Sequence, residues 1–132
     1  MSRYCLDTSA YGRFQSGEPR VVALVDSADW IGVPAVVLGE LWAGFLQGRK
    51  AEANARELKS FLAHPLVHVV PIEQDAARIF GEIVADLRSR GTPIPTNDIW
   101  VGAAAVRAGA SVLTFDRHFR AMGRVGAIVL EP

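Results

Sequence analysis

Four acidic side chains could together perform metal-dependent chemistry: Asp7, Glu40, Asp98 and Asp116. Carboxylates that converge in one crevice repel one another, and they take up protons near neutral pH unless a cation lies among them. Mg²⁺ suits a site of several carboxylates with retained waters, and Mn²⁺ is a chemically similar substitute. Zinc is disfavoured because the sequence has no Cys/His cluster.

Each acid also has a simple structural explanation. Asp7 and Asp116 each follow an apolar run and precede a helical pattern, so either can cap a helix and complement its dipole. Glu40 can lie on a narrow solvent-facing strip of an apolar helix. Asp98 falls in a first helical turn, where the dipole favours a carboxylate. Because four separate explanations are then needed, we favour one shared site.

The chemistry expected of such a site is phosphodiester hydrolysis. A carboxylate-bound Mg²⁺ neutralises phosphate oxygens, lowers the pKa of a bound water and stabilises the leaving oxygen. It also reverses the local charge, so a chain with 14 basic and 14 acidic residues can bind RNA or DNA without an overall basic field. Basic residues that follow Asp116 are predicted to contact phosphates, or else to form a solvated helix face: Arg117, His118, Arg120 and Arg124.

Short apolar runs alternate with amphipathic segments along the whole chain. The predicted strands cover residues 3–7, 30–34, 67–71, 111–115 and 127–130. The predicted helices cover residues 35–48, 51–64, 73–91 and 97–109, with weaker ones after Asp7 and Asp116. Gly91 and Gly109 are expected at helix ends, and Thr96 or Asn97 is expected to cap the helix that follows.

Strands that are separated by helices predict a largely parallel sheet with helices on both faces. In such sheets, ligands bind beyond the carboxyl ends of the strands, where the strand order reverses. Asp7 and Asp116 both follow predicted strands. If these two strands are neighbours, their carboxylates project into one crevice.

Composition predicts one domain over residues 1–132, because half of the chain is hydrophobic and can form a core. The single Cys5 cannot form an internal disulfide, and no long apolar stretch opens the sequence, so a cytoplasmic location is expected. Cys5 itself is expected to be a buried strand residue. No membrane span is expected, because Glu40 and Arg107 interrupt the most apolar stretches.

Four sequence segments resemble the PIN-domain endoribonucleases, specifically the VapC-like toxins of type II toxin–antitoxin systems. They are "LDTS", "VVLGELWAG", "TNDIWVGAAAVRAG" and "VLTFDRHF", in the family's order and approximate spacing along the whole chain. The resemblance implies a three-layer α/β/α sandwich with a five-stranded, mainly parallel sheet.

The resemblance also implies a Mg²⁺-dependent site formed by Asp7, Glu40, Asp98 and Asp116. Supporting hydroxyl and amide positions match Thr8, Ser9, Asn97 and Thr114. Where the last motif often has a second acid, this chain has His118, which is therefore not expected to be a metal ligand. Our hypothesis is that three aspartates hold the metal, directly or through water, while Glu40 binds a second metal or orients the attacking water.

Proteins similar to these usually cut specific RNAs, act as homodimers and are inhibited by a cognate antitoxin whose tail enters the active-site groove. Hydrolysis by water should leave a 5′-phosphate and a 3′-hydroxyl. Trp42, Phe45 and Trp100 could supply an apolar partner surface, although ordinary core packing is the alternative for each.

Other α/β proteins also place acids at strand ends. A phospho-receiver domain needs a lysine near its acceptor aspartate, but Lys50 and Lys59 lie far from any predicted strand end. A haloacid-dehalogenase-like phosphatase needs an acid where this chain has Ser9, and no glycine-rich nucleotide loop follows a strand. The alternative that remains is a non-catalytic PIN-like domain that binds RNA or a protein.

Overall fold

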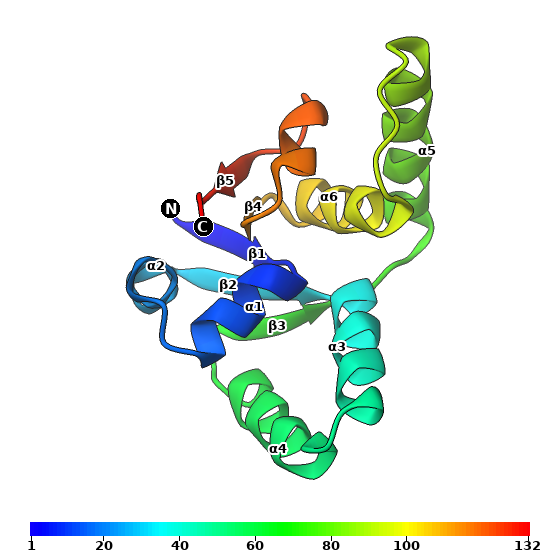
Figure 1. Cartoon of the computed structure of the whole chain (residues 1–132). Helices are drawn as coiled ribbons and strands as arrows, with labels where there is room; N and C mark the ends of the chain where they lie inside the picture. The colour runs from blue at the N-terminus through cyan, green and yellow to red at the C-terminus, as the bar shows by residue number, and fades with distance from the viewer.

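The computed structural model describes residues 1–132 as a parallel sheet with helices on both of its faces (Figure 1). The strands are β1 (Arg3–Leu6), β2 (Trp30–Pro34), β3 (Val67–Val70), β4 (Ser111–Thr114) and β5 (Ala127–Val129). The α-helices are α1 (Thr8–Gln15), α2 (Pro19–Ser27), α3 (Ala35–Gln47), α4 (Ala51–Leu62), α5 (Gln74–Ser89) and α6 (Thr96–Ala108). A short 3₁₀ helix, η1 (Arg117–Ala121), precedes β5.

The strand order across the sheet is β3-β2-β1-β4-β5, and every neighbouring pair is parallel. Cys5 in the central strand lies opposite Gly32 of β2 on one side and Val112 of β4 on the other. This arrangement confirms the predicted α/β fold with its five-stranded, mainly parallel sheet.

The three layers follow from the handedness of the crossovers. The chain moves from β1 through β2 to β3 in one direction, so right-handed crossovers put α1, α2 and α4 on one face. It then returns past β1 to β4 and β5, which puts α5, α6 and η1 on the other face. Figure 1 shows α5 and α6 above the sheet and α4 below it, while α3 lies at the carboxyl edge and contacts both α1 and α6.

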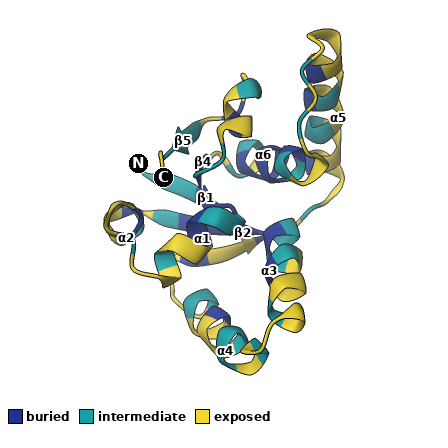
Figure 2. Ribbon diagram, viewed as in Figure 1, coloured by how far each residue is buried: buried dark blue, intermediate teal, exposed yellow.

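Helix α6 is the most deeply buried helix, as its dark colour in Figure 2 shows. Its middle residues, from Val101 to Ala105, are all buried and most are small, so the sheet can approach closely. A Cβ atom added at Gly102 would come within 3.0 Å of Val125 and 3.1 Å of the Met122 sulfur. A side chain at this position would therefore force Val125 and Met122 to shift, so glycine favours the close packing of the segment after η1 against this helix.

The structure differs from the local predictions at three points. Helix α2 was not predicted: it begins at Pro19 after Glu18, whose carboxylate accepts a hydrogen bond from the Val21 N–H at 3.0 Å. The element after Asp116 is a 3₁₀ helix rather than an α-helix. The cap position of α6 is Pro95, with no side-chain cap, so neither Thr96 nor Asn97 caps it. Gly109 ends that helix in the left-handed conformation, as expected.

Cys5 is fully buried, and burial raises the pKa of its thiol to about 12. This agrees with the expected strand residue without a reactive thiolate. None of the helices has the length and apolar character that a membrane crossing requires.

Candidate active site

Strand order reverses between β1 and β4, and two of the predicted acids lie at this point. Asp7 follows the last residue of β1, and Asp116 comes two residues after the end of β4. The two strands are paired, with Leu6 opposite Leu113. The expectation that the two strands are neighbours is thus correct, and both carboxylates lie at the edge where parallel α/β sheets bind ligands.

Asp7 is buried, with 6% of its surface exposed, and both of its carboxylate oxygens accept hydrogen bonds. One oxygen, Oδ1, accepts from the Ala10 N–H at 2.9 Å, which caps α1, and from the Ser9 hydroxyl at 2.8 Å. The other, Oδ2, accepts from the Thr114 hydroxyl. Burial nevertheless raises the pKa of Asp7, with a smaller contribution from the Asp116 charge.

Two hydroxyl groups tie the ends of β1 and β4 together. Thr114, fully buried at the end of β4, donates to Asp7 and accepts from the Asp116 N–H at 2.9 Å. Ser9 donates to Asp7 and accepts from the Phe115 N–H at 3.1 Å. These bonds hold the backbone at Phe115 and Asp116 against the side chain of Asp7.

A second group of side chains is more open: Asp98, Asp116 and His118. The Nδ1 atom of His118 lies 2.9 Å from Asp116 Oδ1 and 3.3 Å from Asp98 Oδ2. One donor atom from each residue lies within 4.8 Å of the others. Burial, followed by the charge of Asp116, raises the pKa of Asp98 to about 6.

Glu40 projects from α3 toward the residues that adjoin the other acids. Its carboxylate accepts from the Thr8 hydroxyl at 2.9 Å and from the Asn97 amide at 3.4 Å. Thr8 adjoins Asp7, and Asn97 adjoins Asp98. Glu40 is half-buried, so it is part of this polar network rather than of a purely solvent-facing strip.

An open hollow of about 580 Å³ adjoins one of the four acids, Asp116. It is lined by Ser9, Phe115, Asp116, Arg117, His118, Glu131 and Pro132. Of the arginines predicted to contact phosphates, Arg120 is paired with Glu131 at 3.0 Å and Arg124 with Glu82 at 2.9 Å. Arg117 lines the hollow and forms no ion pair.

Sequence reasoning missed two further arginines beside this hollow. The guanidinium carbon of Arg13 lies 4.6 Å from the centre of the Phe115 ring, and that of Arg20 lies 5.7 Å from it. Their approach to Phe115 depends on how α1 and α2 pack near the end of β4, and no local motif indicates it.

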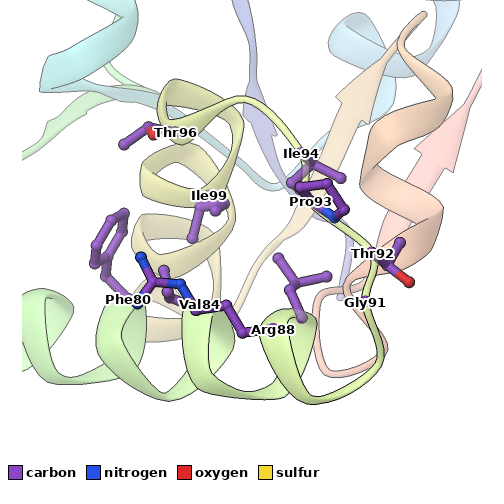
Figure 3. A pocket seen from close by; sticks show the side chains of 10 residues that line it. Phe80, Val84, Arg88, Gly91, Thr92, Pro93, Ile94, Thr96 and Ile99 are labelled. Atoms are coloured by element: carbon purple, nitrogen blue, oxygen red, sulfur yellow. The ribbon is translucent and has the colours of Figure 1, made fainter.

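A separate hollow of about 430 Å³ lies between α5, α6 and the loop that joins them (Figure 3). Phe80 and Val84 line it from α5, while Ile94 and Ile99 line it from the loop and α6. None of the predicted site residues lines this hollow, so the candidate active site remains at the β1–β4 edge.

The donor set at that edge suits a hard divalent cation. Carboxylate oxygens with room for retained waters are the ligands of Mg²⁺, and the same oxygens suit Mn²⁺. The carboxylates of Asp98 and Asp116 lie close together. Asp7 is linked to Asp116 through the Thr114 hydroxyl. Glu40 is linked through Thr8 and Asn97, which adjoin Asp7 and Asp98 in the sequence.

The fold and the site together define a class: a five-stranded parallel α/β protein with an acidic crevice where the strand order reverses. The family model described as "PIN domain" matches residues 4–125, so the chain belongs to the PIN-domain family. It is 34% identical over 102 residues to ribonuclease VapC4 of Mycobacterium tuberculosis, an alignment that covers 77% of this chain and 78% of that protein.

Two solved structures share the fold. VapBC2 from Rickettsia felis, bound to a DNA fragment from its promoter, superposes with a TM-score of 0.83 at 21% identity over 98% of this chain and 99% of that chain. VapBC-5 from Mycobacterium tuberculosis, a member of the VapBC family of toxin–antitoxin systems, gives a TM-score of 0.72 at 24% identity with full coverage of both chains.

Proposed function

We propose that the protein is a metal-dependent endoribonuclease that acts as the toxin of a toxin–antitoxin pair. The observation that carries this proposal is the convergence of acids at the β1–β4 edge, with their positions set by buried hydroxyl bonds. A domain that only binds a partner has no need of carboxylates whose burial and mutual repulsion raise the pKa of Asp98. The similarity to proteins named ribonucleases supports the choice of RNA as substrate.

Asp98 and Asp116, together with Asp7, would hold Mg²⁺, or Mn²⁺ in its place. A cation at this position neutralises phosphate oxygens and lowers the pKa of a bound water. Glu40 is held by Thr8 and Asn97 with its carboxylate directed toward the site, where it can orient the attacking water or bind a second cation.

RNA would enter through the hollow beside Asp116. Arg117 is free of ion pairs there, and Arg13 lies over the Phe115 ring, so both can meet backbone phosphates. Phe115 also offers an aromatic ring against which a base can stack. Arg120 and His118 are at the same rim, although Arg120 must first leave Glu131.

The partners we propose are a cognate antitoxin and a second copy of the chain, in the cytoplasm. An apolar surface on α3 and α4 supports a protein partner: the exposed fraction is 44% for Trp42 and 71% for Leu46. Trp42 also lines a hollow of about 550 Å³ between the two helices. Trp100, by contrast, stacks on Phe80 at 3.8 Å and belongs to the packing of α5 on α6.

The experiment that tests this function is cleavage of total cellular RNA by wild-type protein and by Asp98→Asn, with Mg²⁺, with Mn²⁺ and with EDTA. Asp26→Asn is the matched control, because Asp26 is an exposed, unpaired acid on α2. Discrete fragments should form with wild type and the control only when metal is present, and should carry a 5′-phosphate and a 3′-hydroxyl.

Two results would contradict the proposal. Fragments that end in a 2′,3′-cyclic phosphate would exclude hydrolysis by an external water. RNA binding without cleavage under any condition would instead support a non-catalytic RNA-binding domain.

A further inference from the structure

His118 occupies a special position among the side chains of the site. Its Nδ1 atom faces carboxylate oxygens from two different elements, Asp98 on α6 and Asp116 before η1. No lysine or arginine forms an ion pair with either acid. The imidazole is thus the one nitrogen group placed where these two carboxylates meet.

The two separations that join His118 Nδ1 to the carboxylate oxygens are compatible with those around a metal ion as well as with hydrogen bonds. Mg²⁺ and similar ions hold their ligands at about 2.0–2.1 Å in octahedral geometry, so adjacent ligand atoms are roughly 3 Å apart. His118 Nδ1 lies 2.9 Å from Asp116 Oδ1 and 3.3 Å from Asp98 Oδ2. Each separation is close to one edge of such an octahedron.

Local structure also holds the histidine in place. Asp116 Oδ1 accepts the His118 backbone N–H at 2.9 Å, which fixes the first turn of η1. The next residue, Phe119, is fully buried and anchors the 3₁₀ helix in the core. The His118 side chain itself is about half exposed, so water molecules and substrate can reach the same point.

We propose that His118 is a metal ligand through Nδ1, and that the resulting mixed nitrogen and oxygen site binds Mn²⁺ in preference to Mg²⁺. Mn²⁺ accepts the same oxygen ligands as Mg²⁺, but it opens the first-row series of divalent metals whose affinity for nitrogen-containing sites exceeds that of Mg²⁺, a hard cation that selects oxygen ligands. This inference rests on the metal-dependent site of the proposed function, and it revises the expectation that His118 is not a ligand.

The test is direct metal binding by the purified full chain in the absence of RNA. Affinities for Mn²⁺ and Mg²⁺ are measured for wild type, for His118→Ala and for His118→Asp, which makes the site all-oxygen. His68→Ala is the control, because His68 is an exposed histidine on β3. Pulsed electron paramagnetic resonance of the bound Mn²⁺ then reports whether a ligand nitrogen is coupled to the metal.

We expect a nitrogen coupling in wild type and in His68→Ala that is lost in both His118 variants. The preference for Mn²⁺ over Mg²⁺ should fall by about tenfold or more in His118→Asp, the scale on which changes around a metal site alter affinity. His118→Ala should bind Mn²⁺ more weakly while it binds Mg²⁺ nearly as before.

Two outcomes would overturn the inference, and they are distinguishable. If Mn²⁺ binds and supports RNA cleavage without nitrogen coupling, then His118 only neutralises the carboxylates, and the proposed function stands. If the folded wild-type protein binds neither metal, then both the inference and the metal-dependent function fail.

Discussion

The two halves of the acidic site differ in how completely their carboxylates are satisfied. Asp7 is buried, and both of its oxygens accept hydrogen bonds from the protein. Asp98 and Asp116 are more exposed, and the His118 imidazole lies between their carboxylates, while Asp116 also lines an open hollow. We call these the closed half, formed by Asp7 with Ser9 and Thr114, and the open half, formed by Asp98, Asp116 and His118.

This contrast shows how a small domain can maintain a cluster of like charges. In the closed half, hydrogen bonds from Ser9, Ala10 and Thr114 satisfy the carboxylate of Asp7 and add a side-chain link between the ends of the paired strands β1 and β4. The open half retains unsatisfied charge, and this unsatisfied charge favours binding of a cation. Different residues of one site therefore hold the strand ends together and remain open to bind a cation.

The largest expected effect is that of Asp7→Asn. Asparagine retains the oxygen that caps α1, so the free energy of unfolding in metal-free buffer should stay within about 1 kcal/mol of wild type. The loss of the charge should reduce RNA cleavage by more than about 100-fold, beyond the range seen for residues around a metal site. Denaturant unfolding and a cleavage assay measure the two effects.

The distinction between the two halves would be wrong if this substitution unfolded the protein. A large stability loss would make Asp7 chiefly a helix cap, and the closed half would then have no catalytic part. Asp26→Asn provides the baseline for loss of one exposed acid.

Thr114→Val should have the next largest effect. Valine has nearly the same shape but leaves Asp7 Oδ2 and the Asp116 N–H without the partner that joins them. We expect a loss of about 1–3 kcal/mol in the free energy of unfolding and a roughly 10- to 100-fold loss of cleavage. The matched control is Thr92→Val, whose hydroxyl only bonds the Arg90 carbonyl; if both variants lose cleavage equally, the bridge is unimportant.

The open half should also make stability depend on pH in metal-free buffer. The pKa of Asp98 is about 6 in the folded chain, above the ordinary aspartate value of 3.8. The folded state thus binds more protons between about pH 4 and 6, so the free energy of unfolding should fall as pH rises through this window. Each pKa unit corresponds to at most about 1.4 kcal/mol, and the contribution is smaller here because Asp98 is partly exposed.

Unfolding curves measured across this range, with and without Asp98→Asn, check the expectation. The Asp98→Asn substitution should reduce the dependence of the free energy of unfolding on pH. Saturating Mn²⁺ should abolish this dependence, because it binds the charged form of Asp98. A slope that is unchanged in Asp98→Asn would show that another group, such as Asp7, dominates.

The smallest effect is expected for Arg117→Ala at the rim of the open half. One phosphate contact at an exposed position contributes modestly and is screened by salt, so affinity for single-stranded RNA should fall a few-fold at low ionic strength. Arg78→Ala, on the exposed face of α5, should have no effect. If both variants lose the same affinity for RNA, then Arg117 does not contact the RNA specifically.

Much of the fold could be predicted because its signals are local. Each strand is a short run of branched or aromatic residues, and α5 has a regular amphipathic pattern. Helix α2 lacks such a signal because its valine-rich segment from Pro19 to Leu24 reads equally well as a strand. The start of α6 was misplaced because Pro95 fixes the backbone at the cap position without a side-chain bond.

The site was predicted only in outline. The rule that parallel strands end at one edge places Asp7 near Asp116, since it depends only on the order of strands and helices. The hydroxyl bridge through Thr114, the bond from Thr8 to Glu40 and the placement of His118 depend on side-chain orientations set by tertiary packing. The family resemblance indicates Thr8 and Thr114 as supporting hydroxyl positions, but no pattern in the sequence shows which group each hydroxyl contacts.

The pairing of β1 with β4 also has a consequence for the timing of protein synthesis. Asp7 is translated among the first residues, but the hydroxyl that fixes it belongs to Thr114, and its acidic neighbour is Asp116. A nascent chain therefore has no complete acidic site until nearly all of the described residues have left the ribosome. Any activity of this site therefore appears only after the segment with Thr114 and Asp116 has joined the folded chain.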